Sequence, residues 1–173
     1  MIAIETLLGP DGWSGEFTSP PQMNPLTEDD ALQEAQVLDV RFDALRLTVG
    51  VLFELRGALQ LREANTGVLI ARGVHELSWT AGPRTTSRTA WTVMSSRPEP
   101  RDGLFALSLG MWPESRFILH AERAAFFCGD VPGLERIPDY GTEEEAAISA
   151  NLASWQSNFE PLQAVFVDPM QAI

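Results

Sequence analysis

The chain has 173 residues, of which 45% are hydrophobic, and its formal net charge is −12. This length and hydrophobic content fit one domain that buries a sizeable core, and they argue against extensive disorder. The 24 Asp and Glu residues outnumber the 12 basic residues, all of them Arg, so nucleic-acid phosphates and anionic membrane surfaces repel the chain.

Residues 1–26 are rich in Gly, Pro and Ser, and residues 1–35 are predicted to form an irregular N-terminal segment. Trp13 and Phe17 are expected to pin this segment to the domain through their rings. The acidic run Glu28-Asp29-Asp30 follows Thr27. Either Thr27 caps one short helical turn, or the run forms a solvated acidic loop.

Residues 36–134 predict a β core, because apolar and polar residues alternate with a period of two. The clearest alternation spans residues 38–42 and 45–55, with Asp43-Ala44 as the connection between two strands. Leu52 breaks the polar face of the second strand, which suggests that this face is partly covered. Further strands or hairpin arms are expected at 59–62, 68–71, 73–79, 90–94, 104–109, 117–122 and 124–128.

The C-terminal part differs in character. Thr142 as N-cap and Glu145 three residues later predict a helix over 142–155, supported by alanines and by one apolar face. Residues 156–173 are expected to form a packed tail. The predicted fold is a single mainly β domain spanning 1–173: an antiparallel β-sandwich or partly open barrel with one C-terminal α-helix.

Three side chains invite a search for nucleophilic chemistry: His75, His120 and the single cysteine, Cys128. One cysteine cannot form an intramolecular disulfide. A Cys–His pair is conceivable if the strands are neighbours. However, Cys128 ends the apolar run Phe126-Phe127, which is typical of a buried structural thiol.

The sequence contains no metal-binding spacing of Cys and His, no glycine-rich phosphate loop and no G-x-S-x-G motif. We therefore expect no cofactor and no metal, and we interpret the chain as non-enzymatic. The N-terminus lacks the features of a signal peptide, and no run approaches a membrane span, so a cytoplasmic protein without a membrane partner is expected.

The five tryptophans are the more informative feature, and most of them are expected to pack in the core or at its edge. Trp112 is the best candidate for an exposed anchor, because Met111-Trp112-Pro113 lies in a predicted turn. The acidic residues expected to face a basic protein partner are Glu28, Asp29, Asp30, Asp139, Glu143 and Glu144. The strong acidity is equally compatible with a role in solubility alone.

The segment from Gln36 to Leu134 carries a family resemblance. Three stretches carry the resemblance: VLDVRFDALRLTVGVLFEL, NTGVLIARGVHELSW and FILHAERAAFFCGDVPGL. It resembles uncharacterised actinobacterial proteins found near toxin systems, and a β-rich family of immunity proteins from bacterial polymorphic toxin systems. This resemblance implies a cytosolic protein that binds and neutralises a cognate toxin, with no catalytic residues to transfer. The N-terminal 35 residues and the C-terminal helix and tail depart from the pattern.

Three functions therefore remain open from the sequence. The first is a protein-binding module, such as an immunity protein that occludes a toxin. The second is a hydrolase whose site combines carboxylates with His75 or His120. The third is a β protein that binds a small apolar ligand in its interior.

Overall fold

The computed structural model describes residues 1–12, 19–83 and 87–171. The predicted anchors Trp13 and Phe17 lie outside these ranges. The described chain forms an antiparallel sheet with little helix, in this order: β1 (Ile2–Ala3), η1 (Ile4–Leu8), β2 (Gln36–Asp43), β3 (Thr48–Glu54), β4 (Thr66–Ala81), β5 (Trp91–Pro98), β6 (Phe105–Trp112), β7 (Ser115–Asp130), α1 (Glu145–Ala150), β8 (Asn158–Val167) and η2 (Pro169–Gln171).

Six of the strands close on themselves. The sheet order is β1-β8-β7-β4-β3-β2-β5-β6, and β6 pairs in addition with β7. The strands from β7 through β4, β3, β2, β5 and β6 therefore form a ring, while β8 and β1 extend the sheet from β7. The weakest link is between β2 and β5, which pair only at Gln36–Thr92 and Val37–Trp91. The prediction of a mainly antiparallel β fold is confirmed.

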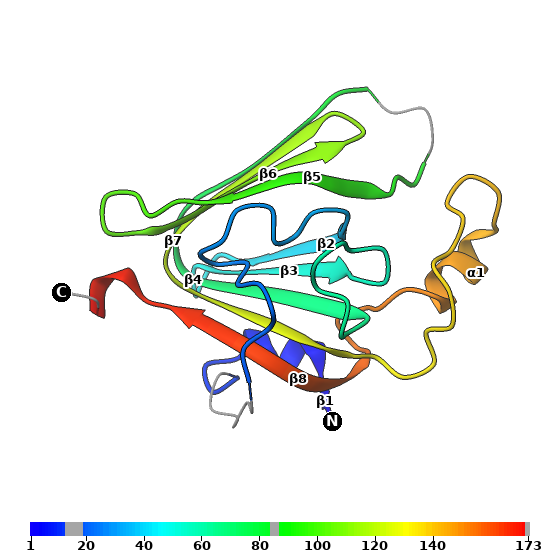
Figure 1. The fold of residues 1–173 in the computed structure, drawn as a ribbon, viewed down its shortest axis with the longest axis horizontal. Helices are drawn as coiled ribbons and strands as arrows, with labels where there is room; N and C mark the ends of the chain where they lie inside the picture. The colour runs from blue at the N-terminus through cyan, green and yellow to red at the C-terminus, as the bar shows by residue number, and fades with distance from the viewer. Residues whose placement is uncertain (13–18, 84–86, 172–173) are drawn as a thin grey trace.

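The two longest strands join the two halves of the ring. β4 and β7 have 16 residues each and pair along their whole length. The first half of β4 also pairs with β3, whereas the first half of β7 also pairs with β6. Figure 1 shows the β5–β6 hairpin above the β2–β3 hairpin, and at the left β4 and β7 bend from one layer to the other. Near the change of partner, Gly73 adopts a φ of +66°, which favours glycine.

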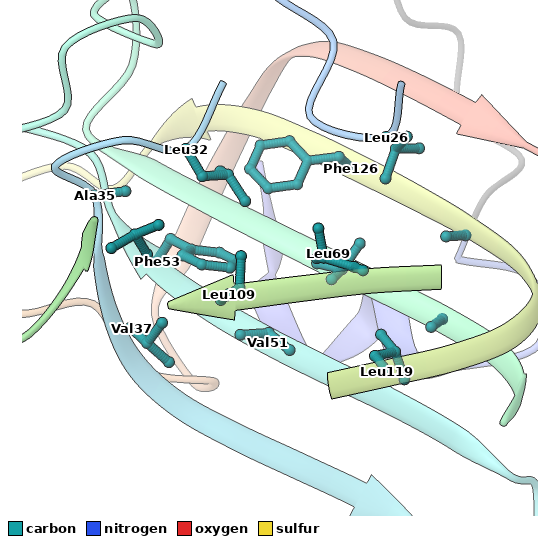
Figure 2. Close-up of a cluster of buried hydrophobic side chains, with 14 of the residues drawn as sticks. Leu26, Leu32, Ala35, Val37, Val51, Phe53, Leu69, Leu109, Leu119 and Phe126 are labelled. Carbon is teal, nitrogen blue, oxygen red and sulfur yellow. The ribbon is translucent and has the colours of Figure 1, made fainter. Parts of the chain in front are cut away.

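The larger core cluster fills the interior of the ring. Phe53 and Phe126 meet there with ring centroids 5.9 Å apart, and leucines from β4, β6 and β7 surround them (Figure 2). Segment 24–35 closes one opening, because Leu26, Leu32 and Ala35 are buried in the same cluster. Its backbone is held to β5, since Glu34 N–H donates to Val93 O at 2.8 Å.

A second cluster covers the face of β3, β4 and β7 that points away from the interior of the ring. Ile4 and Leu7 of η1, Trp155 and Phe159 pack there against Leu52 and its neighbours. Every residue of β3 is consequently buried. The predicted covering of the second face at Leu52 is confirmed, and the supposedly irregular N-terminal segment supplies part of the cover through β1 and η1.

The C-terminal helix is shorter than predicted. α1 spans Glu145–Ala150 rather than 142–155, and Glu144, not Thr142, is its N-cap, with no side-chain capping bond. Ala153 and Trp155 lie beyond its end, and both are buried in the second cluster. The predicted tail contains a full strand, β8, which pairs with the second half of β7.

Several strand boundaries also differ from the prediction. The connection between β2 and β3 is longer than Asp43-Ala44, since β3 begins at Thr48. Residues 59–62 lie in a loop rather than a hairpin arm. The segment 124–128 is not a separate strand but the continuation of β7.

Candidate interaction surface

An apolar cleft opens into the ring beside the short β2–β5 contact. It encloses about 370 Å³. Trp79 of β4 and Trp91 of β5 form its aromatic side, with ring centroids 5.5 Å apart at an interplanar angle of 79°. Trp79 remains 38% exposed although it also packs edge-on against Phe117. The lining residues are Val37, Leu38, Asp39, Val40, Leu77, Trp79, Trp91 and Phe117.

Two strand edges flank this cleft without a partner in the described part of the chain. After Val37, β2 pairs with β3 alone, so the opposite edge of residues 39–43 is open. Residues 76–81 of β4 pair with β7 alone, because the β3 ladder ends at Arg72. The Val40 N–H donates instead to the Asp39 carboxylate at 2.9 Å. Such edges offer backbone donors and acceptors to an added strand.

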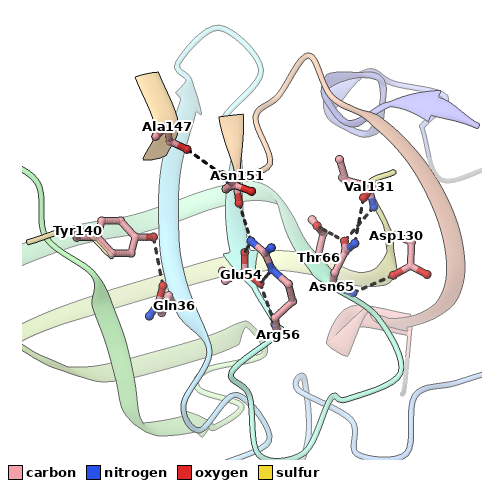
Figure 3. Close-up of polar contacts among 10 residues, drawn as sticks. All are labelled: Gln36, Glu54, Arg56, Asn65, Thr66, Asp130, Val131, Tyr140, Ala147 and Asn151. Atoms are coloured by element: carbon pink, nitrogen blue, oxygen red, sulfur yellow. Dashed lines mark hydrogen bonds and ion pairs between the residues drawn. The ribbon is translucent and has the colours of Figure 1, made fainter. Parts of the chain in front are cut away.

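One acidic residue lines the cleft, and an acidic segment lies at one end of it. Asp39 lines it and accepts a hydrogen bond from Trp155 Nε1 at 2.7 Å. Tyr140 donates its hydroxyl to Gln36 Oε1 at 3.2 Å (Figure 3), which places the acidic segment 139–145 beside the start of β2. Burial raises the pKa of Tyr140 to about 12, helped by the neighbouring Glu54 carboxylate.

Within this segment, the predicted partner-binding residues differ in their availability. Glu143 forms an ion pair with Arg136 and accepts the Asp139 N–H at 2.8 Å, and the Arg136 bond lowers its pKa to about 2. A hydrogen bond from the Thr142 hydroxyl, with one from the Gly141 N–H, lowers the pKa of Asp139. Glu144 is exposed and makes no side-chain bond among the described residues.

The other predicted acidic cluster lies elsewhere. Asp29 forms an ion pair with Arg97 at 2.6 Å, and Asp30 accepts the Ser96 N–H at 3.1 Å. Glu28 accepts the N–H of Asn24 at 2.5 Å. Along β5, Ser96 and Arg97 are four and five residues beyond Thr92, a separation of roughly 15 Å. The two acidic clusters therefore lie near opposite ends of β5.

The exposure predicted for Trp112 is confirmed, but Trp112 belongs to β6 rather than to a turn. It ends β6 opposite Thr92, and 67% of the residue is exposed. Its neighbour Met111 points into the core, so Trp112 projects from the outer face of the ring. Trp112 thus lies at the same end as Trp91 but on the other side of the sheet. Trp79 and Trp91 lie at the edge of the core, a position that the sequence allows for any of the tryptophans, but no sequence feature singled out these two.

The nucleophile candidates do not converge. Cys128 is buried, and burial raises the pKa of its thiol to about 12. His120 is on the same strand, separated by roughly 26 Å of extended chain. His75 Nε2 lies 3.4 Å from Glu122, and His120 Nδ1 lies 3.2 Å from Glu76. A Cys–His pair is therefore excluded, and the buried Cys128 agrees with the structural role predicted for it.

Two further searches cover the described residues. No group of three or more His, Cys, Asp or Glu side chains in these ranges is placed to hold a metal ion. The helices within them fall short of the length and apolar character needed to cross a membrane. Comparisons of the chain with family models, with curated proteins and with solved structures found no match.

Proposed function

We propose that this chain is a non-enzymatic binding protein that takes an extended, basic segment of a protein partner into the cleft between β2 and β4. The observation that carries the proposal is the pair Trp79 and Trp91. Both rings line the apolar cleft, and both remain partly accessible to solvent. Large aromatic residues of this kind dominate the free energy of protein association.

The open strand edges support an extended segment over an enclosed small ligand. The cleft volume, about 370 Å³, is near the lower limit for small-molecule sites. An added strand would gain main-chain hydrogen bonds from β2 or β4, and its alternate side chains would enter the cleft. Alternate side chains would do so because successive side chains of a strand point to opposite faces.

Charge supports a basic partner. Asp39 lies in the cleft, Glu144 lies on the acidic segment beside it, and the whole chain carries −12. A basic segment would therefore be drawn to this side during encounter, and its arginine or lysine side chains would meet carboxylates at the rim.

The resemblance to immunity proteins makes the proposed partner more specific: a bacterial toxin that is neutralised by occlusion. This part is tested by co-expressing the chain with the toxin domain encoded by a neighbouring gene. Protection of growth that is lost in Trp79→Ala supports it. Absence of a toxin gene in the neighbourhood, or no protection by the wild type, overturns the immunity assignment without affecting the peptide measurement described next.

The cleft itself is tested with two labelled ten-residue peptides, one alternating Arg with Val and one alternating Glu with Val. Fluorescence anisotropy should detect binding of the basic peptide only. Trp79→Ala should weaken it at least tenfold, whereas Trp112→Ala, on the outer face, should change it less than twofold. The proposal is overturned if neither peptide binds, if both bind equally, or if only Trp112→Ala reduces binding.

A further inference from the structure

A second cleft lies on the outer face of β5, β6 and β7, away from the Trp79–Trp91 cleft. The strand register places Arg97 opposite Ser108, and Ser108 opposite Ile118. In the same way Gly110 faces Arg116, and Ala106 faces His120. The intervening residues Leu107, Leu109 and Leu119 point into the core, so these side chains share the outward face.

The shape of this cleft follows from residue size. Ala106, Ser108 and Gly110 of β6 are small, while the longer side chains of β5 and β7 rise on either side. The resulting cleft encloses about 320 Å³. It is lined by Arg97, Glu99, Pro100, Arg101, Ala106, Leu107, Ser108, Arg116, Ile118 and His120.

Arginine side chains are concentrated here although the chain as a whole is acidic. Three of the 12 arginines line the cleft, against one carboxylate, Glu99. Arg97 is engaged with Asp29, but Arg101 and Arg116 are exposed and form no side-chain hydrogen bond or ion pair within the described ranges. These two guanidinium groups are therefore available to a ligand.

His120 adds a fourth nitrogen-bearing group. Its Nδ1 lies 3.2 Å from Glu76 Oε2, and its side chain is 18% exposed. Glu76 is the register partner of His120 on β4, so the carboxylate orients the ring from the side away from β6. A carboxylate at one ring nitrogen fixes the orientation of the imidazole and leaves the other nitrogen for a ligand.

A larger cleft, of about 650 Å³, offers a contrast. It also contains three arginines, Arg46, Arg72 and Arg123, but Glu122 and Asp168 line it as well. Arg46 forms an ion pair with Asp43, and Arg72 donates to the carbonyl oxygens of Leu7 and Gly9. Arg72 thus holds the N-terminal segment against the sheet, and Arg46 is paired within its own turn.

From these contacts the geometry points to an anion site in the β5–β6–β7 cleft for a ligand that carries a phosphate group. Guanidinium groups bind phosphate oxygens through paired hydrogen bonds, and the Ser108 hydroxyl can donate a further one. The volume exceeds what one phosphate ion fills, so a phosphate monoester with a small organic group fits as well as the free ion. A nucleic-acid strand is disfavoured by the charge of −12.

The test is a calorimetric titration of the full chain at low ionic strength with inorganic phosphate, glycerol 3-phosphate and succinate. Both phosphate compounds should bind, and their relative affinities separate the free ion from the monoester. Arg116→Gln should weaken binding at least tenfold. Arg62→Gln is the matched control, because Arg62 is also exposed and without a partner in the described chain but lies outside the cleft.

Both variants should keep the wild-type melting temperature, since neither arginine is bonded to another described residue. The proposal is overturned if the wild type binds neither phosphate compound at millimolar concentration, or if Arg62→Gln weakens binding as much as Arg116→Gln. Succinate binding as tightly as the phosphate compounds would also overturn the assignment to phosphate.

Discussion

Arg56 and Glu54 form a buried two-point ion pair at the end of β3: Arg56 Nε lies 2.8 Å from Glu54 Oε1, and Nη2 lies 2.6 Å from Oε2. The Glu54 side chain is only 1% exposed and that of Arg56 14%. Arg56 Nη2 also donates to the carbonyl oxygen of Asn151 at 2.6 Å (Figure 3). One guanidinium thus neutralises a core carboxylate and fastens the end of α1 to the sheet.

Replacing Arg56 should consequently be costly. Arg56→Met leaves the Glu54 carboxylate buried without its counter-charge, and we expect the free energy of unfolding to fall by about 3–5 kcal/mol. The double variant Glu54→Leu/Arg56→Met removes both charges and should recover part of that loss. Urea denaturation of the two variants measures the difference. A single variant as stable as the wild type would contradict the importance of the pair.

Acid should weaken one surface contact in a defined range of pH. The pKa of Glu143 is lowered from 4.5 to about 2 by Arg136. A carboxylate with a depressed folded-state pKa stabilises the fold above its ordinary pKa, and this contribution is lost as the pH falls from about 4.5 to about 2. Glu143→Gln should therefore be less stable than the wild type at pH 6, and the difference should shrink towards pH 2.

The matched control for this titration is Glu144→Gln. Glu144 is exposed and makes no side-chain bond among the described residues, so its replacement should change stability little at any pH. Urea midpoints measured between pH 6 and pH 2.5 compare the three proteins. Equal pH dependence of wild type and Glu143→Gln would show that the Arg136 contact contributes nothing to stability.

The cysteine offers a reporter of unfolding. Cys128 is 2% exposed, and burial raises the pKa of its thiol to about 12. Because the thiolate is the reactive species, the folded protein should resist a disulfide reagent at pH 8, and labelling should occur at the rate of unfolding. A urea-denatured sample serves as the fully reactive control. Stoichiometric labelling of the folded protein within seconds would contradict this burial.

Alternation in the sequence predicted the strands well where one face meets the ring interior. In β3, Val49, Val51 and Phe53 belong to the cluster inside the ring, whereas Leu52 belongs to the second cluster on the other face. β8 was missed, since Pro161 and an irregular pattern conceal a strand that owes its existence to pairing with the distant β7. The helix was drawn too long, because alanine content indicates helix propensity but not the burial of Ala153 in the second cluster.

The two clefts were beyond the reach of sequence patterns for a related reason. Trp79 and Trp91 are accessible only because β2 leaves β5 after Val37, which is a property of long-range pairing. Arg97, Arg101 and Arg116 are brought together by the register of three strands. By contrast, the exposure of Trp112 follows from its local sequence, where proline succeeds it at the end of a strand.

Close packing between β7 and β8 provides a test of that missed strand. Gly129 approaches β8 so tightly that an added Cβ would overlap the carbonyl oxygen of Glu160 and lie 2.6 Å from the Phe159 ring. Phe159 is fully buried, so the ring cannot easily move aside. We expect Gly129→Ala to destabilise the fold by about 1–3 kcal/mol through overpacking.

Gly57→Ala is the matched comparison, because the nearest atom to its new Cβ, Ile137 Cδ1, would be 3.5 Å away, an ordinary contact. That change should be neutral or stabilise by up to about 1 kcal/mol, since alanine restricts the unfolded chain. Urea denaturation distinguishes the two variants, and far-ultraviolet circular dichroism shows whether Gly129→Ala keeps its strand content. Equal stability of both variants would mean that β8 shifts to accommodate the added methyl group. The C-terminal strand would then be packed only loosely against β7 and the second core cluster.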